Sequence, residues 1–174
     1  MSELATVPSV ERRTRTRPLP PTGFERLLAY GSVALLAIVL VALLRGYSDW
    51  GDVPLLVWLH ILTVAVSLAL TPVLLLGRRG ARRHRWLGYA WIVAMSSTAL
   101  LSFGIRDINH GGLSPIHVLS AITLTQAPML AWHAQRHRVE AHRYTALSLI
   151  LGALLIAGAF TFPFGRMLGR WLLS

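Results

Sequence analysis

Four of the seven histidines in this 174-residue chain lie at or near the starts of four different hydrophobic segments. They are His60, His84, His117 and His142. If the segments cross a bilayer in alternate directions, His60 and His117 lie toward one side and His84 and His142 toward the other. Two imidazoles on neighbouring helices can ligate the iron of one haem. The spacing therefore predicts two pairs of haem ligands, an outer pair and an inner pair.

Other ligand chemistries are limited by what the chain lacks. It contains no cysteine, which excludes disulfides, iron–sulfur clusters and thiolate ligands. It has no glycine-rich phosphate loop, no HExxH sequence and no nucleophile elbow. His133, one turn before the end of its segment, competes with the inner pair as a ligand, whereas His110 and His137 are expected in loops.

Residues next to the histidines suit the remaining parts of a haem. Gly88 follows His84 by four positions on the same helical face, where a flat macrocycle needs space. Arg85 and Arg143 directly follow the two inner histidines, and Arg106 ends the third hydrophobic segment. A guanidinium pairs well with a carboxylate, so each of these arginines is predicted to bind a haem propionate.

The elements that must position these residues are membrane spans. Hydrophobic residues make up 54% of the chain and charged residues 14%, a balance that exceeds the needs of a soluble domain. Five apolar stretches are long enough to cross about 30 Å of hydrocarbon at about 1.5 Å per residue. We place them at 27–44, 53–76, 86–105, 115–134 and 144–162. The expected fold is therefore an all-α polytopic membrane protein with five transmembrane helices, of which the last four form a bundle.

The chain divides into four regions on the same grounds. Residues 1–26 form an Arg- and Pro-rich stretch that cannot bury enough apolar area to fold, so we expect a disordered cytoplasmic tail. Residues 27–44 are expected to be a first transmembrane helix that remains as a signal anchor. Residues 53–162 hold the four-helix bundle, and residues 163–174 are expected to be a short external segment.

Orientation follows from the arginines, since the chain has 17 arginines and no lysine. Thirteen lie in the tail and in the second-to-third and fourth-to-fifth connections, and four lie on the other side. The positive-inside rule then puts the N-terminus in the cytoplasm and the C-terminus outside, in the bacterial cytoplasmic (inner) membrane. The formal net charge of +10 therefore reflects topology and attraction to the lipid surface, and it does not indicate nucleic-acid binding.

From about Leu59 to Gly165 the chain resembles a family of bacterial integral membrane proteins of unknown function. The resemblance covers about 60% of the chain. It rests on five features: His60, the run His84-Arg-Trp-Leu-Gly88, the sequence Ser114-Pro-Ile-His117, the sequence Glu140-Ala-His142-Arg143, and a last span ending Ala-Gly-Ala-Phe-Thr-Phe-Pro. It supplies a membrane fold without a mechanism.

The chain is more distantly similar to the transmembrane ascorbate-dependent ferric reductase cytochromes b. Those proteins have a four-helix core with two bis-histidine haems, and their ligands pair second helix with fourth and third with fifth. His84-Arg-Trp-Leu-Gly88 resembles the His-x-Trp-x-Gly at the start of their third helix. The present chain is shorter, lacks a sixth helix and lacks their substrate-binding loops, so the resemblance implies haem binding but no particular electron donor.

These observations predict a membrane b-type cytochrome that carries one or two bis-histidine haems and transfers electrons across or within the membrane. Bis-imidazole ligation leaves no open iron position, which favours electron transfer over oxygen activation. The chain would then act as a component of a transmembrane oxidoreductase, with a redox protein or a quinone as partner, and its oligomeric state is open. Replacing His60 or His117 with alanine is expected to abolish an outer-haem signal.

Two other classes of function stay open. The first is a non-redox accessory or assembly protein, which needs no ionisable groups in the membrane. The chain has no Asp or Glu inside any expected span, which agrees with this reading. That absence argues against the other member of this class, a small transporter subunit coupled to protons. Binding of zinc or copper without haem is the third reading, and it is weakened by the lack of carboxylates or thiols near either histidine pair.

Overall fold

The computed structural model describes residues 20–105, 115–163 and 165–174, so most of the predicted tail lies outside the described residues. The described residues are helical and contain no strand. The helices are α1 (Gly23–Arg45), η1 (Tyr47–Asp52), α2 (Leu55–Leu76), α3 (Arg82–Ser102), α4 (Pro115–Gln135), α5 (Val139–Ser148), η3 (Leu149–Ile156), α6 (Ala157–Ala159) and α7 (Met167–Leu173). The segments α5, η3 and α6 run on without a break, so the described chain has five long helices.

The five long helices lie where the apolar stretches are, but several of them begin earlier than expected. α3 begins at Arg82 and α5 at Val139, which places His84 and His142 inside the first turns of their helices. α1 begins at Gly23, so residues 23–26, which we expected in the tail, are helical. The apolar pattern missed these turns because each of them carries charged or polar side chains.

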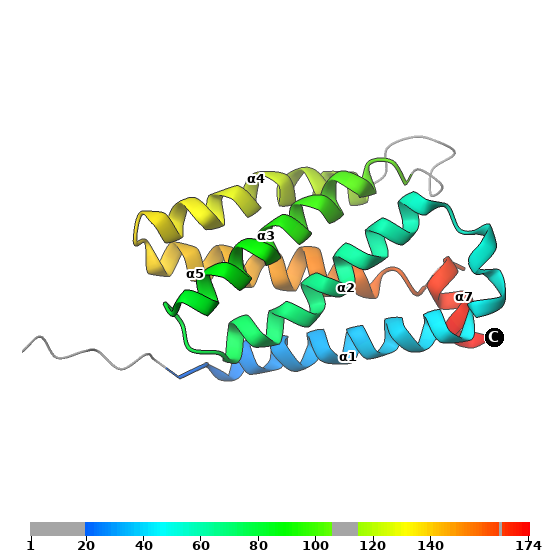
Figure 1. The fold of residues 1–174 in the computed structure, drawn as a ribbon, viewed down its shortest axis with the longest axis horizontal. Coiled ribbons are helices and arrows are strands. Elements are labelled where there is room, and N and C mark those ends of the chain that lie inside the picture. Colours follow the sequence, from blue (N-terminus) through cyan, green and yellow to red (C-terminus); the bar gives the residue numbers. More distant parts are fainter. Residues whose placement is uncertain (1–19, 106–114, 164) are drawn as a thin grey trace, which may run out of the picture.

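The long helices lie side by side along the longest axis of the molecule, and successive helices run in opposite directions (Figure 1). The starts of α1, α3 and α5 and the ends of α2 and α4 meet at one end of the bundle. We call it the arginine end. Its nine described arginines are Arg26, Arg78, Arg79, Arg82, Arg83, Arg85, Arg136, Arg138 and Arg143. α1 is a full member of the bundle, because Leu28, Ala29 and Leu35 belong to the main core cluster.

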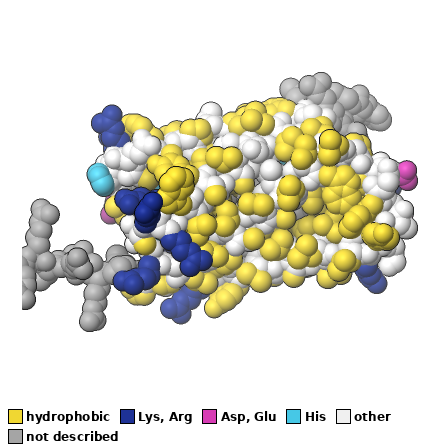
Figure 2. All heavy atoms as spheres, viewed as in Figure 1, with side chains coloured by type: hydrophobic (Ala, Val, Ile, Leu, Met, Phe, Trp, Pro, Cys, Tyr) yellow, Lys and Arg dark blue, Asp and Glu magenta, His cyan; other side chains and the backbone are white. Residues whose placement is uncertain are grey.

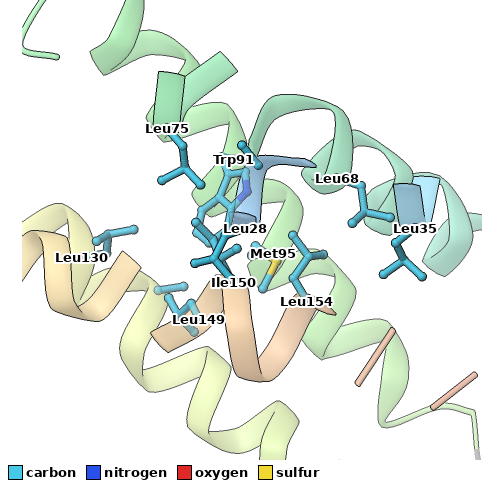
Figure 3. Packing of buried hydrophobic residues seen from close by; sticks show 12 residues of the cluster. Leu28, Leu35, Leu68, Leu75, Trp91, Met95, Leu130, Leu149, Ile150 and Leu154 are labelled. Atoms are coloured by element: carbon cyan, nitrogen blue, oxygen red, sulfur yellow. The ribbon is translucent and has the colours of Figure 1, made fainter. Parts of the chain in front are cut away.

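Many apolar side chains lie on the outside of the bundle, and several polar side chains are buried inside it. Leucines such as Leu44, which is 73% exposed, cover the outside, whereas Ser32, Ser67 and Thr71 are completely buried. Figure 2 shows apolar side chains over the length of the visible face and arginines gathered mainly at one end. Inside, Trp91, Met95 and aliphatic side chains from all five long helices pack together (Figure 3). Such a surface is compatible with a lipid bilayer.

Three of the described helices are long and apolar enough to cross a membrane: α1, α2 and the continuous helix Val139–Ala159. α3 and α4 have similar lengths but a more polar composition. α3 begins with three arginines and His84, and α4 carries two histidines, two glutamines and several hydroxyl side chains. Five transmembrane helices were expected from the sequence. The described part of the chain has five long helices, and three of them are long and apolar enough to cross a membrane.

The C-terminal segment folds back on the end of α1 opposite the arginine end. Leu168 and Trp171 of α7 pack against Val39 and Ala42 of α1 in a second core cluster. Trp171 Nε1 donates to Asp49 Oδ2 over 2.9 Å, and the Arg45 guanidinium donates to the Leu172 carbonyl. Residues 167–173 are thus a docked helix.

Candidate functional site

A cavity of about 600 Å³ lies inside the arginine end, and we call it the inner cavity. This volume is within the range of about 300–1,000 Å³ that ligand sites occupy. Residues from α1, α2, α3, α4 and α5 line it, together with residues of the two connections at that end. Several lining residues, including Arg85 and Gln135, are exposed, so the cavity reaches the surface.

Three imidazoles from three helices line the inner cavity: His84 of α3, His133 of α4 and His142 of α5. The inner pair predicted from the sequence is thus brought to one cavity, along with its predicted competitor. His133 is 8% exposed, and its Nδ1 is buried without a hydrogen-bond partner. A buried polar atom without a partner costs free energy, so this imidazole is a candidate to bind a ligand in the cavity.

His142 is oriented by the backbone of the neighbouring helix. Its Nδ1 lies 3.0 Å from the Leu130 carbonyl oxygen of α4. A carbonyl only accepts, so this contact requires the proton on Nδ1 and leaves the Nε2 lone pair available. A hydrogen bond of this kind is what fixes the tautomer of histidines that ligate metals.

Open space lies beside His84. Gly88, one turn later on α3, lines the inner cavity, and a Cβ atom built on it would meet no other atom within 4 Å. The deeper wall is apolar and includes Trp91, Ile92 and Ile150. The cavity therefore combines an apolar interior with a polar mouth, as an amphipathic planar group requires.

Of the residues that the structure describes, four charged ones line the inner cavity: Glu25, Arg79, Arg85 and Arg143. Glu25 is 1% exposed and bridges two of the arginines. Its Oε2 lies 2.7 Å from Arg79 Nη2, and its Oε1 accepts from Arg143 Nε over 2.8 Å. Thr22 and Glu25 also form a capping box at the start of α1, which holds the carboxylate at the first turn.

The predicted outer pair has different surroundings. His60 lines a second cavity of about 100 Å³, the outer cavity, and its Nδ1 lies 3.2 Å from the Thr98 carbonyl oxygen. His117 is 3% exposed and packs against Phe103, with 5.6 Å between ring centroids. His117 is not among the described residues that line the outer cavity. The structure therefore does not bring the outer pair to a shared cavity.

The outer cavity lies among hydroxyl side chains. Thr98 Oγ1 donates to Thr63 Oγ1 over 2.8 Å, and the hydroxyl oxygens of Ser102 and Ser120 are 2.5 Å apart. The cavity has room for about three water molecules at about 30 Å³ each. It has no room for a porphyrin.

The remaining predicted site residues divide between the inner cavity and the undescribed segment. Arg85, Arg143 and Gly88 all line the inner cavity. Arg106 and His110 lie outside the described residues. His137, expected in a loop, lies in the turn between α4 and α5 with a φ of 55° and also lines the inner cavity.

Glu25 and Arg79 are the residues that sequence reasoning missed. The Thr-x-x-Glu sequence directly before an apolar run is a capping-box signature and could have placed Glu25 at the start of a helix. Nothing in the sequence pairs it with Arg143. Within the described residues, no group of three or more His, Cys, Asp or Glu side chains is arranged to hold a metal ion. A site that depends on two imidazoles remains compatible with that finding.

Comparison with known proteins adds no relative: no protein-family model, no curated protein and no solved structure matches this chain.

Proposed function

We propose that this chain is a five-helix protein of the bacterial cytoplasmic membrane that holds one b-type haem in the inner cavity and transfers electrons through it. One observation carries the proposal. A cavity of about 600 Å³ brings together four imidazoles of the described residues, two of them from the predicted inner pair, with arginines at its mouth and apolar walls inside. Histidine ligands, partners for carboxylates and an apolar slot are the features that a b-type haem needs.

The packing of the five long helices supports the proposal that all five insert into the membrane. α3 lies against α2 and α4, and the buried hydroxyl groups of Ser102, Ser120 and Thr123 find hydrogen-bond partners inside the bundle. In a bilayer such groups face the protein interior. The arginine end then lies in the cytoplasm by the positive-inside rule, and α7 lies at the external surface.

The proposed ligands are His84 and His142, with His133 as the competing ligand. The Leu130 carbonyl holds the His142 imidazole with Nε2 available, and His133 offers a buried nitrogen without a partner. Gly88 leaves the space that the macrocycle needs, and Arg79, Arg85 and Arg143 offer guanidinium groups to its carboxylates. When bound, the haem supplies one-electron redox chemistry, and the residues of the chain set its orientation and exclude water.

We propose one haem, because the outer cavity of about 100 Å³ is too small for a second. His60 then serves as a hydrogen-bonding residue between α2 and α3, and His117 as a buried packing residue of α4. The electron donor and acceptor are a redox protein or a quinone.

The test is a dithionite-reduced minus oxidised absorption spectrum of the purified protein, with pyridine haemochrome quantification per chain. We expect a b-type α-band and one haem per chain. His142→Ala and the double variant His84→Ala/His133→Ala are expected to lose the signal, whereas the matched control His60→Ala/His117→Ala keeps it. A spectrum without haem bands after expression with ample haem would reject the proposal and leave an accessory membrane role as the better account.

A further inference from the structure

The charge of the inner cavity is set by few residues. Among the described residues, its charged lining residues are one carboxylate, Glu25, and three guanidiniums, Arg79, Arg85 and Arg143. With neutral imidazoles, the lining therefore carries a net formal charge of +2. A ligand with two carboxylates complements this charge, whereas a neutral ligand of the same shape does not.

Glu25 is the residue that lowers this charge, and it does so from a rigid position. Its Oε2 lies 2.7 Å from Arg79, and its Oε1 lies 2.8 Å from Arg143. The capping box with Thr22 fixes it on α1. A guanidinium has five N–H donors, and Glu25 occupies only part of that set on each arginine. Both arginines therefore keep donors for a second carboxylate, in competition with Glu25.

We propose that the inner cavity selects a planar ligand with two carboxylates and that Glu25 is a specificity-determining residue, acting through Arg79 and Arg143. This inference rests on the proposed function, because a b-type haem is such a dicarboxylate. Glu25 limits the electrostatic gain from the ligand carboxylates, since it already neutralises part of the arginine charge. Removing its charge strengthens the preference of the cavity for the diacid over a neutral analogue.

The variant Glu25→Gln isolates the charge. Glutamine supports the same capping box as glutamate, so the start of α1 keeps its hydrogen bonds. The probes are haem b and its dimethyl ester, which has the same ring and no carboxylate charge. Each is titrated by absorbance into the full chain purified in a neutral detergent. The quantity measured is the ratio of the two dissociation constants.

In Glu25→Gln we expect this ratio to shift about tenfold toward haem b, comparable to one additional charge-assisted hydrogen bond. Glu140→Gln is the matched control, because Glu140 lies exposed in the first turn of α5 and outside the cavity lining. It makes the same change in net charge and should leave the ratio unchanged. Arg79→Gln lowers the cavity charge to +1 and should weaken haem b while leaving the ester unaffected.

The failure of this inference differs from that of the proposed function. If the wild-type chain binds neither porphyrin, the proposed function is rejected and this inference falls with it. If it binds both and the ratio is the same in Glu25→Gln and Glu140→Gln, the haem site stands and the role of Glu25 is rejected. Should Glu25→Gln not fold, Arg79→Gln and the charge-preserving Glu25→Asp decide the question. The inference is contradicted if the ratio of dissociation constants changes in Glu25→Asp but not in Arg79→Gln.

Discussion

Arg143 Nε donates to Glu25 Oε1 over 2.8 Å and so joins α5 to the first turn of α1. The two residues are 118 positions apart in the chain. Arg79, just after α2, contacts the other oxygen of the same carboxylate. One buried side chain therefore ties three parts of the arginine end together, at the wall of the inner cavity.

Replacing Glu25 with alanine should destabilise the bundle. The change removes a buried carboxylate and leaves two half-exposed guanidiniums without it, at a cost of roughly 1–3 kcal/mol. We expect a lower thermal unfolding midpoint in detergent, followed by circular dichroism. Glu140→Ala is the control for the loss of an exposed carboxylate and should change the midpoint little. The double variant Glu25→Ala/Arg143→Ala should lose less stability than the sum of the losses in the two single variants. A loss equal to that sum would show that the two residues do not interact.

Filling the space beside Gly88 should remove ligand binding without harming the fold. A Cβ atom at Gly88 meets nothing within 4 Å, so a leucine side chain would extend into the inner cavity. Leucine in place of glycine also favours a helix by roughly 1 kcal/mol. For Gly88→Leu we expect an unchanged or higher unfolding midpoint and loss of the haem spectrum.

Gly152→Leu is the matched control for this prediction. Its Cβ also meets nothing within 4 Å, and Gly152 is not among the lining residues of the inner cavity. Haem content should be retained in this variant. Full haem content in Gly88→Leu would show that the ligand does not lie against α3.

The buried hydrogen bond between Trp91 and Thr71 should contribute to stability. Trp91 Nε1 donates to Thr71 Oγ1 over 3.0 Å, and both side chains are buried. Thr71→Val keeps the shape but leaves the indole N–H without an acceptor, at a cost of about 1–3 kcal/mol. We expect a lower unfolding midpoint for Thr71→Val, little change for Thr71→Ser, and partial recovery when Trp91→Phe is added. No recovery in that double variant would mean that the hydrogen bond is not the cause.

The docking of α7 should depend on pH through Asp49. Hydrogen bonds from Trp171 and Ser48, with the nearby charge of Arg170, hold the pKa of the Asp49 carboxyl below its ordinary value. The stabilising effect of a carboxylate with a lowered pKa is fully present above the ordinary value of about 3.9 and is lost as the pH falls through the lowered pKa. α7 should therefore stay docked at neutral pH and loosen below about pH 4.

A spin label measures this transition, because the chain has no cysteine of its own and Leu173 is exposed. In a labelled Leu173→Cys protein, label mobility should be low from pH 7 to pH 5 and rise on further acidification. Adding Asp49→Asn should raise mobility at neutral pH and flatten its pH dependence. Equal mobility profiles with and without Asp49→Asn would rule out this carboxylate as the cause.

Local sequence information was enough to place the helices and to group the inner histidines. Apolar runs depend on nearest neighbours along the chain, so all five long helices were located. The largest errors lie at charged first turns such as that of α3, and smaller ones at other ends, such as the end of α3 at Ser102 where residue 105 was expected. The alternation of the helices put His84 and His142 at the same end together with Arg85 and Arg143. This placement needed only the lengths of the helices and the shortness of their connections.

Only the tertiary structure decided how the side chains meet. The lateral arrangement and rotation of each helix depend on packing between distant segments, which no local pattern contains. That packing put His133 and Glu25 into the inner cavity, left about 100 Å³ beside His60, and turned His117 toward Phe103. The sequence by itself therefore determined which residues lie at which end of the bundle, and long-range packing decided which of them share a cavity large enough for a ligand.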